Sequence, residues 1–156
     1  MKTLQTLEFT KLSPEAITPK KAHDSDAGLD LYSYGVEESN EELLTVKLKT
    51  GISFKIPQNH FLSLHLRSSS SKKEYMLANG TGIIDEDYLG ECFVVLRFFS
   101  AKAFYRFLAK KEYEENKIAQ VILLEKPPYQ LKEVPLEVFK TYNTERGQGG
   151  YGSTGN

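Results

Sequence analysis

The sequence predicts an all-β fold with little helix, and three observations support this. Most of the chain alternates apolar and polar residues with a period of two. Turn-forming pairs such as Ser13-Pro14, Asn79-Gly80 and Pro127-Pro128 interrupt the alternation at short intervals, as in sandwiches and barrels. The length of 156 residues suits one core, so we expect residues 1–145 to form a single domain.

The strands are predicted from two kinds of apolar pattern. Strict alternation at residues 4–9, 52–56 and 62–66 predicts strands with one buried face. Two richer apolar runs, at residues 93–99 and 118–124, predict strands that are covered on both faces or buried between subunits. We expect these two runs to form the centre of the core.

The segment of residues 97–117 carries two conflicting signals. Phe104, Phe107 and Leu108 have helical spacing, whereas residues 110–116 are charged and lack a turn glycine. We interpret the segment as a strand that leads into a long charged loop.

The C-terminal residues 146–156 read RGQGGYGSTGN, with five glycines and no aliphatic side chain. Such a segment buries too little apolar surface to offset the entropy lost on ordering. We therefore expect a mobile, glycine-rich arm. Arg146 and the aromatic ring of Tyr151 would allow this arm to close over a ligand, although an ordinary flexible terminus has the same composition.

Composition excludes several classes of protein. The chain has 20 Lys and Arg against 21 Asp and Glu, a balance that argues against stable nucleic-acid binding or attachment to anionic membranes. No apolar stretch is long enough to span a membrane, and residues 1–10 do not form a secretion signal. The single cysteine, Cys92, suits a reducing compartment and a role as core filler. We expect a cytoplasmic or nuclear protein.

Two segments carry residues suited to phosphate chemistry. Arg67 precedes four serines, so its guanidinium and the serine hydroxyls can converge on phosphate oxygens. An ordinary serine-rich surface loop that binds no ligand would have the same sequence. Three carboxylates at residues 85–87 follow an apolar pair, so one of them can polarise water at the rim of a dry pocket, or all can belong to an acidic turn. The sequence has no Walker loop, nucleophile elbow, dinucleotide fingerprint or paired zinc-binding histidines.

Five segments, taken in order, resemble the five motifs of the trimeric deoxyuridine triphosphate nucleotidohydrolases, the dUTPases. The third and fifth of these motifs are the most specific, and the match spans nearly the whole chain. The segments are AGLDL at residues 27–31, RSS at 67–69, GIIDEDYLG at 82–90, IAQ at 118–120 and RGQGGYGSTG at 146–155.

The resemblance implies a β-clip subunit, which is jelly-roll-like, assembled as a homotrimer. Each active site would lie at a subunit junction and take the flexible arm, residues 146–156, from a neighbour. The implied reaction converts dUTP and water to dUMP and pyrophosphate, with Mg²⁺ bridging the phosphates. Such an activity limits uracil incorporation into DNA and supplies dUMP for dTMP synthesis.

The resemblance also implies a role for individual residues. Asp85 would orient and deprotonate the attacking water. Tyr88 would lie beneath the deoxyribose and exclude ribonucleotides, because its contact with the sugar leaves no room for a 2′-hydroxyl. Uracil would be read by Asn79 or by backbone in a hairpin at residues 79–82, in a pocket that also excludes thymine. The resemblance also implies that Gly82 and Ile84 contact the substrate.

The remaining implied contacts are with phosphate and metal. Arg67, Ser68, Ser69 and Gln120 would cradle the triphosphate, and Asp30 would bind Mg²⁺ through water. From the arm, the resemblance implicates Arg146, Gly150, Tyr151, Gly152, Ser153 and Thr154.

Two alternatives belong to other classes of function. A dCTP deaminase shares an Arg-Ser-Ser segment, but its usual His-Arg-Ile-Asp-Pro-Gly-Trp pattern is absent here. A non-catalytic trimer that binds nucleotide or a protein partner could use the same fold. Two departures from the dUTPase motifs are Ser69 in place of a glycine and Leu89 in place of an arginine.

Overall fold

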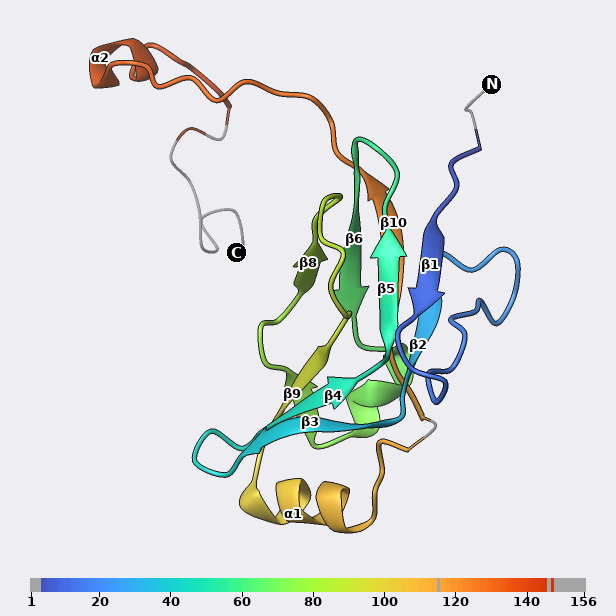
Figure 1. The fold of residues 1–156 in the computed structure, drawn as a ribbon. Helices are drawn as coiled ribbons and strands as arrows, with labels where there is room; N and C mark the ends of the chain where they lie inside the picture. Colours follow the sequence, from blue (N-terminus) through green and yellow to red (C-terminus); the bar gives the residue numbers. More distant parts are fainter. Residues whose placement is uncertain (1–3, 115, 146, 148–156) are drawn as a thin grey trace.

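The structure is a computed structural model that describes residues 4–114, 116–145 and 147. Strands dominate its body (Figure 1), which confirms the all-β class. The strands are β1 (Glu8–Lys11), β2 (Leu29–Ser33), β3 (Gly35–Asn40), β4 (Thr45–Lys49), β5 (Ile52–Lys55), β6 (His60–His65), β7 (Tyr75–Leu77), β8 (Gly82–Ile84), β9 (Val94–Phe98) and β10 (Asn116–Glu125). The helical elements are η1 (Ser68–Lys72), α1 (Ala101–Ala109) and α2 (Leu136–Phe139).

The strands form two four-stranded sheets and a two-stranded ribbon, all with antiparallel pairing. One sheet has the order β2-β10-β6-β8, the second has the order β3-β4-β9-β7, and β1 pairs with β5. A single apolar core joins these layers because alternate residues of each inner strand point inward. Its fully buried members include Leu31, Val46, Leu48, Ile52, Leu62, Val94, Leu96 and Val121.

Strand β10 sets the positions of the polar residues in the first sheet. It pairs with β2 on one edge and with β6 on the other. In this register Gln120 lies opposite both Asp30 and His65. The ladder has an irregularity between Lys117 and Ala119, which re-aims the side chains at the start of the strand.

The predicted strand was wrong for residues 101–109, which form helix α1, whereas the charged residues 110–114 that follow lie in turns. Ser100 caps the helix by accepting a hydrogen bond from the backbone N–H of Ala103 at 3.2 Å. Phe104 and Phe107 are buried against the body, as their helical spacing allows.

Two predictions about strand burial were also wrong for the single chain. The N-terminal strand is shorter than expected, since β1 begins at Glu8, and all four of its residues are exposed. Strand β9 alternates between buried and accessible residues, with Arg97 exposed, so it is not covered on both faces. Phe99 lies beyond the strand and is exposed. The alternative, burial of the 93–99 strand between subunits, stays a prediction.

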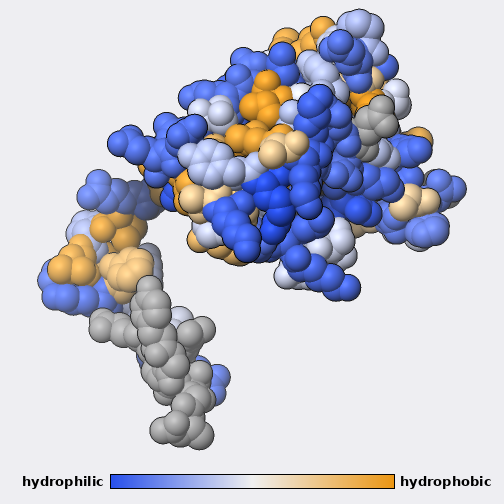
Figure 2. All heavy atoms as spheres, turned by 90° about the horizontal axis from the view of Figure 1, so that it is seen from below, coloured by the Kyte–Doolittle hydropathy of each residue, from blue (hydrophilic) through white to orange (hydrophobic). Residues whose placement is uncertain are grey.

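Residues 126–145 leave the body after β10 and extend away from it (Figure 1). Nearly all of them are exposed, and the short helix α2 buries none of its residues. The segment nevertheless carries large exposed apolar and aromatic side chains, which are Tyr129, Leu131, Leu136, Val138, Phe139 and Tyr142. Orange atoms on the projecting part in Figure 2 mark hydrophobic residues among them.

Within the described residues, no helix has the length and apolar character needed to cross a membrane.

Candidate active site

The most buried ionised group of the first sheet is Asp30, on β2. Its side chain is about 7% exposed and receives two cations, with Arg67 Nε 2.8 Å from Oδ1 and Lys117 Nζ 2.9 Å from Oδ2. A buried carboxylate needs such partners to offset its lost hydration. The contact with Asp30 raises the pKa of Lys117 above its ordinary value, so this lysine stays charged. The first and second motifs therefore meet at one ion cluster, which Lys117, just before the fourth motif, completes.

Gln120 lies beside this cluster and is held from two sides. Its Nε2 donates a hydrogen bond to the carbonyl of Leu66 at 3.1 Å. Gly28 approaches the same side chain so closely that a Cβ at Gly28 would lie 2.0 Å from Gln120 Oε1. The glycine of the first motif thus leaves room for the glutamine of the fourth.

Gly28→Ala is expected to reduce substrate turnover about tenfold or more while the protein still folds. The added methyl group meets the end of a flexible side chain, so Gln120 can swing aside at little cost in stability but loses its position. Steady-state kinetics and a thermal melt of the same sample check this. Gly35→Ala is the control, because a Cβ at Gly35 meets only Lys49 Cδ at 3.9 Å. An unchanged rate in Gly28→Ala would show that the position of Gln120 does not matter.

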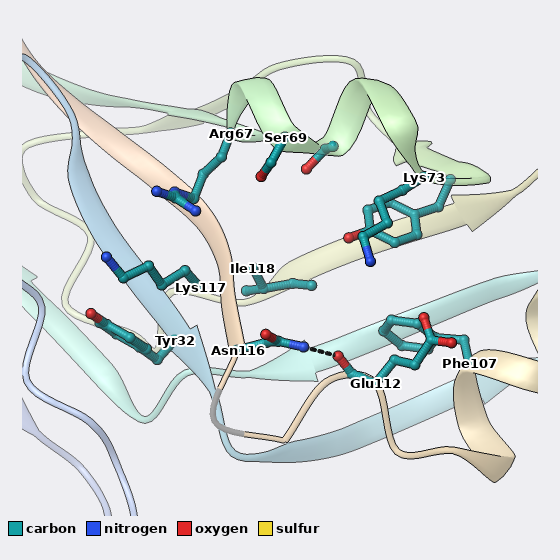
Figure 3. Close-up of a pocket in the computed structure, with 11 residues that line it drawn as sticks. Tyr32, Arg67, Ser69, Lys73, Phe107, Glu112, Asn116, Lys117 and Ile118 are labelled. Carbon is teal, nitrogen blue, oxygen red and sulfur yellow. Dashed lines mark hydrogen bonds between the residues drawn. The ribbon is translucent and has the colours of Figure 1, made fainter. Parts of the chain in front are cut away.

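The serine segment forms the short helix η1, directly after Arg67. Ser68 and Ser69 are both exposed, so their hydroxyls are available to a ligand. Figure 3 shows Arg67 and Ser69 above a pocket of about 270 Å³, with Tyr32 and Lys117 on the side of Arg67. Ser68 and Gln120 are not among the residues that line this pocket.

A second pocket, of about 210 Å³, lies along β8. It brings together four of the predicted uracil and sugar contacts, which are Asn79, Gly82, Ile84 and Tyr88. A Cβ at Gly82 would lie 3.1 Å from Leu64 Cβ, so a glycine lets β8 lie close against β6. The size and mixed lining suit a small planar ring with polar edges.

Asp85 directly follows the pocket residue Ile84 at the end of β8 and does not itself line this pocket. Its carboxylate is exposed and, within the described residues, makes no hydrogen bond or ion pair. Its carbonyl accepts the backbone N–H of Tyr88 at 3.1 Å, which closes a tight turn. The Tyr88 hydroxyl donates to the carbonyl of Glu91 at 3.0 Å, and the ring packs on Gly90 so closely that a Cβ there would lie 2.4 Å from the hydroxyl.

The predicted hairpin at residues 79–82 was wrong. Its flanking strands belong to different sheets, since β7 pairs with β9 and β8 pairs with β6. The turn, with Gly80 at a φ of 70°, carries the chain from one sheet to the other. The uracil contacts expected there are thus presented by a crossover between two layers.

Within one chain, Asp85 lies far from the ion cluster. Ile84 pairs with Leu62 in an antiparallel ladder, so Asp85 lies level with Phe61, and Arg67 lies six residues beyond Phe61. At about 3.3 Å per residue the separation is about 20 Å. A single chain therefore does not bring Asp85 together with Arg67 and Gln120.

Comparison with known proteins decides the family. The dUTPase family profile matches residues 14–155. The chain belongs to the dUTPase family. It is 38% identical over 152 residues to the deoxyuridine 5′-triphosphate nucleotidohydrolase of Crocosphaera subtropica, covering 96% of this chain and 98% of the relative. It is 40% identical over 147 residues to that of Clostridium kluyveri, covering 93% and 94%.

Solved dUTPase structures share the fold. The dUTPase of Staphylococcus bacteriophage 80alpha with dUPNHPP has a TM-score of 0.73 and 26% identity, covering 98% of this chain and 100% of that one. The resemblance read from the five motifs is confirmed, and so is the β-clip type of this dUTPase subunit.

The arm motif of this dUTPase lies outside the described residues. This applies to Arg146, Gly150, Tyr151, Gly152, Ser153 and Thr154, and their predicted roles stay predictions.

Sequence reasoning missed Glu86, which links the Asp85 turn to the root of the projecting segment. Glu86 Oε2 accepts the backbone N–H of Asn59 at 2.8 Å and lies 3.2 Å from Lys126 Nζ. Lys126 in turn donates its backbone N–H to the Asn59 carbonyl at 2.7 Å. Asn59 has a left-handed backbone, with φ of 60°. The three acidic residues at 85–87 gave no sign of this difference between them.

Glu86→Gln is expected to lower the melting temperature slightly, in a pH-dependent way. The Lys126 contact is the main cause that holds the pKa of Glu86 below its ordinary value, so its stabilisation is present above that value. As the pH falls through the pKa in the folded protein, the stabilisation is lost and wild type and variant converge. Melts from about pH 7 to pH 4 measure this. Asp87→Asn removes the same charge without an ion partner and should show no such convergence; identical curves for both variants would contradict the assignment.

The described residues include no group of three or more His, Cys, Asp or Glu side chains suited to a metal ion. Asp30 is unsuited to direct ligation because both its oxygens face cations. Each carboxylate oxygen has a further lone pair, so Asp30 can still accept a hydrogen bond from metal-bound water. Asp85 has both oxygens free for the same purpose.

Proposed function

We propose that this chain hydrolyses dUTP to dUMP and pyrophosphate. The observation that carries the proposal is the pocket along β8, which gathers Asn79, Gly82 and Tyr88, directly before which the turn carries the unpaired carboxylate of Asp85. Relatives of nearly the same length bear the name of this activity. The reaction would limit uracil incorporation into DNA and supply dUMP for dTMP synthesis.

In the proposed reaction, a water attacks the α-phosphorus and gives its proton to Asp85. The new P–O bond forms as the bond to the bridging oxygen breaks, and pyrophosphate leaves with the bonding electron pair. An exposed carboxylate with no competing partner can turn toward the water and accept this proton. Tyr88 provides the surface beneath the sugar, where contact leaves no room for a 2′-hydroxyl.

We assign the phosphates to the residues around the Asp30 ion cluster, and the uracil and sugar to the pocket along β8. These are the two halves of the proposed site. The cluster of Arg67, Asp30 and Lys117 fixes the start of η1, so Ser68 and Ser69 are presented in one arrangement. Gln120 would add a neutral donor. Mg²⁺, when bound, would be held through its waters by the carboxylates of Asp30 and Asp85, and it would neutralise part of the phosphate charge.

The two halves meet only if chains associate. The separation of about 20 Å between Asp85 and Arg67 within one chain fits a site completed by a second copy. The exposed apolar residues of the projecting segment 126–145 also fit burial against a neighbour. We assign a homotrimer with shared sites, closed by the arm from Arg146 onward.

Pyrophosphate release from dUTP, with Mg²⁺ present, tests the function directly. We expect release from dUTP and none from dCTP. Ammonia from dCTP would instead identify a deaminase. Tight binding of dUTP that stays intact over hours would identify a non-catalytic nucleotide-binding trimer.

A further inference from the structure

The segment directly after Tyr88 is tied to another part of the fold. Residues 89–92, which we call the strap, run along the corner between β4 and β5 and are joined to it by four hydrogen bonds. Two of these bonds come from buried hydroxyl groups of the corner. They run from Thr50 Oγ1 to the carbonyl of Cys92 at 2.6 Å and from Ser53 Oγ to the carbonyl of Leu89 at 2.8 Å.

Glu91 joins the strap to the corner through its side chain. Its Oε1 accepts the backbone N–H of Gly51 at 2.7 Å, a bond strengthened by the charge of the carboxylate. Gly51 is buried, so its N–H needs this acceptor. Gly51 has a φ of 65°, and a Cβ there would lie 2.6 Å from Ala16 Cβ and 2.9 Å from Tyr34 Cε1. The corner thus requires a glycine in order to present its N–H to Glu91.

The peptide unit between Glu91 and Cys92 extends this attachment to Tyr88. The Cys92 N–H donates to the carbonyl of Ile52 at 2.8 Å, and the Glu91 carbonyl accepts the Tyr88 hydroxyl at 3.0 Å. Because the N–H and C=O of a trans peptide point in opposite directions, the bond to Ile52 directs the carbonyl toward Tyr88. The carboxylate bond to Gly51 fixes Glu91 on the other side of its Cα.

The ring of Tyr88 is therefore held at its hydroxyl and along one side. A Cβ at Gly90 would lie 2.5 Å from Tyr88 Cζ, so the ring lies directly on this glycine. Tyr88 is nevertheless 45% exposed and lines the pocket along β8. The strap sets the orientation of the ring, while part of the ring stays open to a ligand.

A fixed ring matters for the choice between two sugars that differ by one hydroxyl. The proposed function uses Tyr88 as the surface that leaves no room for a 2′-hydroxyl. A displacement of about 1 Å is enough to change how a substrate is positioned, so a ring free to tilt would admit the ribonucleotide. Exclusion of the wrong substrate by a steric clash requires that the clashing group cannot move away.

We propose that Glu91 is a positioning residue for sugar selection. Its carboxylate bond to Gly51 and its own carbonyl hold the Tyr88 ring where it excludes ribonucleotides. This inference rests on the proposed function, in which Tyr88 lies beneath the deoxyribose. Glu91 acts through Tyr88 and takes no part in the chemical step.

The test compares dUTP with UTP. Pyrophosphate release with Mg²⁺ present gives kcat/KM for each nucleotide, and calorimetry gives the affinity for a non-hydrolysable analogue of each. Glu91→Ala and Tyr88→Phe are each expected to lower the ratio of kcat/KM for dUTP to that for UTP about tenfold, mainly through better use of UTP. The ratio of the two analogue affinities should fall in parallel.

Two further variants separate positioning from general stability. Glu91→Gln keeps an oxygen that accepts the Gly51 N–H, so it should hold the ratio within about threefold of wild type. Ser53→Ala is the matched control, because it removes the strap bond to the carbonyl of Leu89 and leaves the bonds of Glu91 and Tyr88 intact. It should lower the melting temperature and leave the ratio unchanged. Thermal melts of all variants accompany the kinetics.

Three results would overturn the proposal. They are an unchanged ratio in Glu91→Ala and Tyr88→Phe, an equal fall in Ser53→Ala, and a fall in Glu91→Gln as large as in Glu91→Ala. If Glu91→Ala does not fold, Tyr88→Phe decides, since it removes a single hydroxyl from an exposed side chain. A wild-type protein that releases no pyrophosphate from dUTP contradicts the proposed function instead, and the analogue affinities still measure sugar selection.

Discussion

Asp85→Asn is expected to abolish dUTP hydrolysis, with a loss of about 10²–10⁴-fold in kcat, the usual contribution of a positioned base. The amide has nearly the shape of the carboxylate but cannot take a proton from water. Asp85 is exposed and forms no side-chain bond within the described residues, so the variant should fold as well as wild type. Affinity for a non-hydrolysable dUTP analogue should change little, because uracil and sugar contacts are intact.

Three measurements on one preparation decide this prediction. Pyrophosphate release gives kcat, calorimetry gives the affinity for the analogue, and a thermal melt gives stability. Asp87→Asn is the control on the same turn, with the same change of charge, and should keep kcat within about threefold of wild type. Near-normal turnover by Asp85→Asn would show that the base is misassigned. Loss of turnover only in Asp87→Asn would move the role to that residue.

Two inactive proteins are expected to become active when mixed. One is Asp85→Asn with its arm intact, and the other is a chain ending at Glu145 with Asp85 intact. In a trimer with shared sites, a site built from Asp85 of the truncated chain and the arm of the other contains every required part. When the two proteins are mixed at equal concentrations and assemble at random, about a quarter of the sites have this composition.

The mixing experiment requires exchange of subunits before the assay. The two proteins are unfolded and refolded together, and pyrophosphate release is compared with that of each protein refolded alone. Activity well above the sum of the two supports shared sites. Trimers that show no recovery would indicate that Asp85 and the arm of one chain serve the same site. A fully active monomer would remove the basis for sharing altogether.

The strands could be predicted from sequence because alternation is a local property. Residues 52–56 and 62–66 alternate, and the structure places β5 and β6 there, although the predicted single buried face was wrong because Ser53 and Ser63 are buried too. Helix α1 was missed although the Ser100 cap and the spacing of Phe104 and Phe107 are local signals, because the charge of residues 110–116 was weighed with them. Those charged residues begin only after the helix ends at Ala109, and what the sequence did not show is the burial of Phe104 and Phe107 against the body.

The site was predicted unevenly for a related reason. The motifs located Asp30, Arg67 and Gln120, because each carries a recognisable residue type in a recognisable order. They did not reveal that Lys117 would pair with Asp30, since that contact depends on the register of β10 against β2. Nor did they distinguish Glu86 from the two acidic residues beside it.

By itself the sequence determined the all-β class, the family and the chemical groups available for phosphate transfer, since these reside in residue type, order and short-range periodicity. Tertiary structure alone decided which groups meet. Pairing of β2, β10 and β6 brings the phosphate-binding motifs to one ion cluster, whereas the pairing of β8 with β6 leaves Asp85 at a distance from it. The physical reason is that long-range register selects contacts between residues remote in sequence, and no local pattern encodes that register.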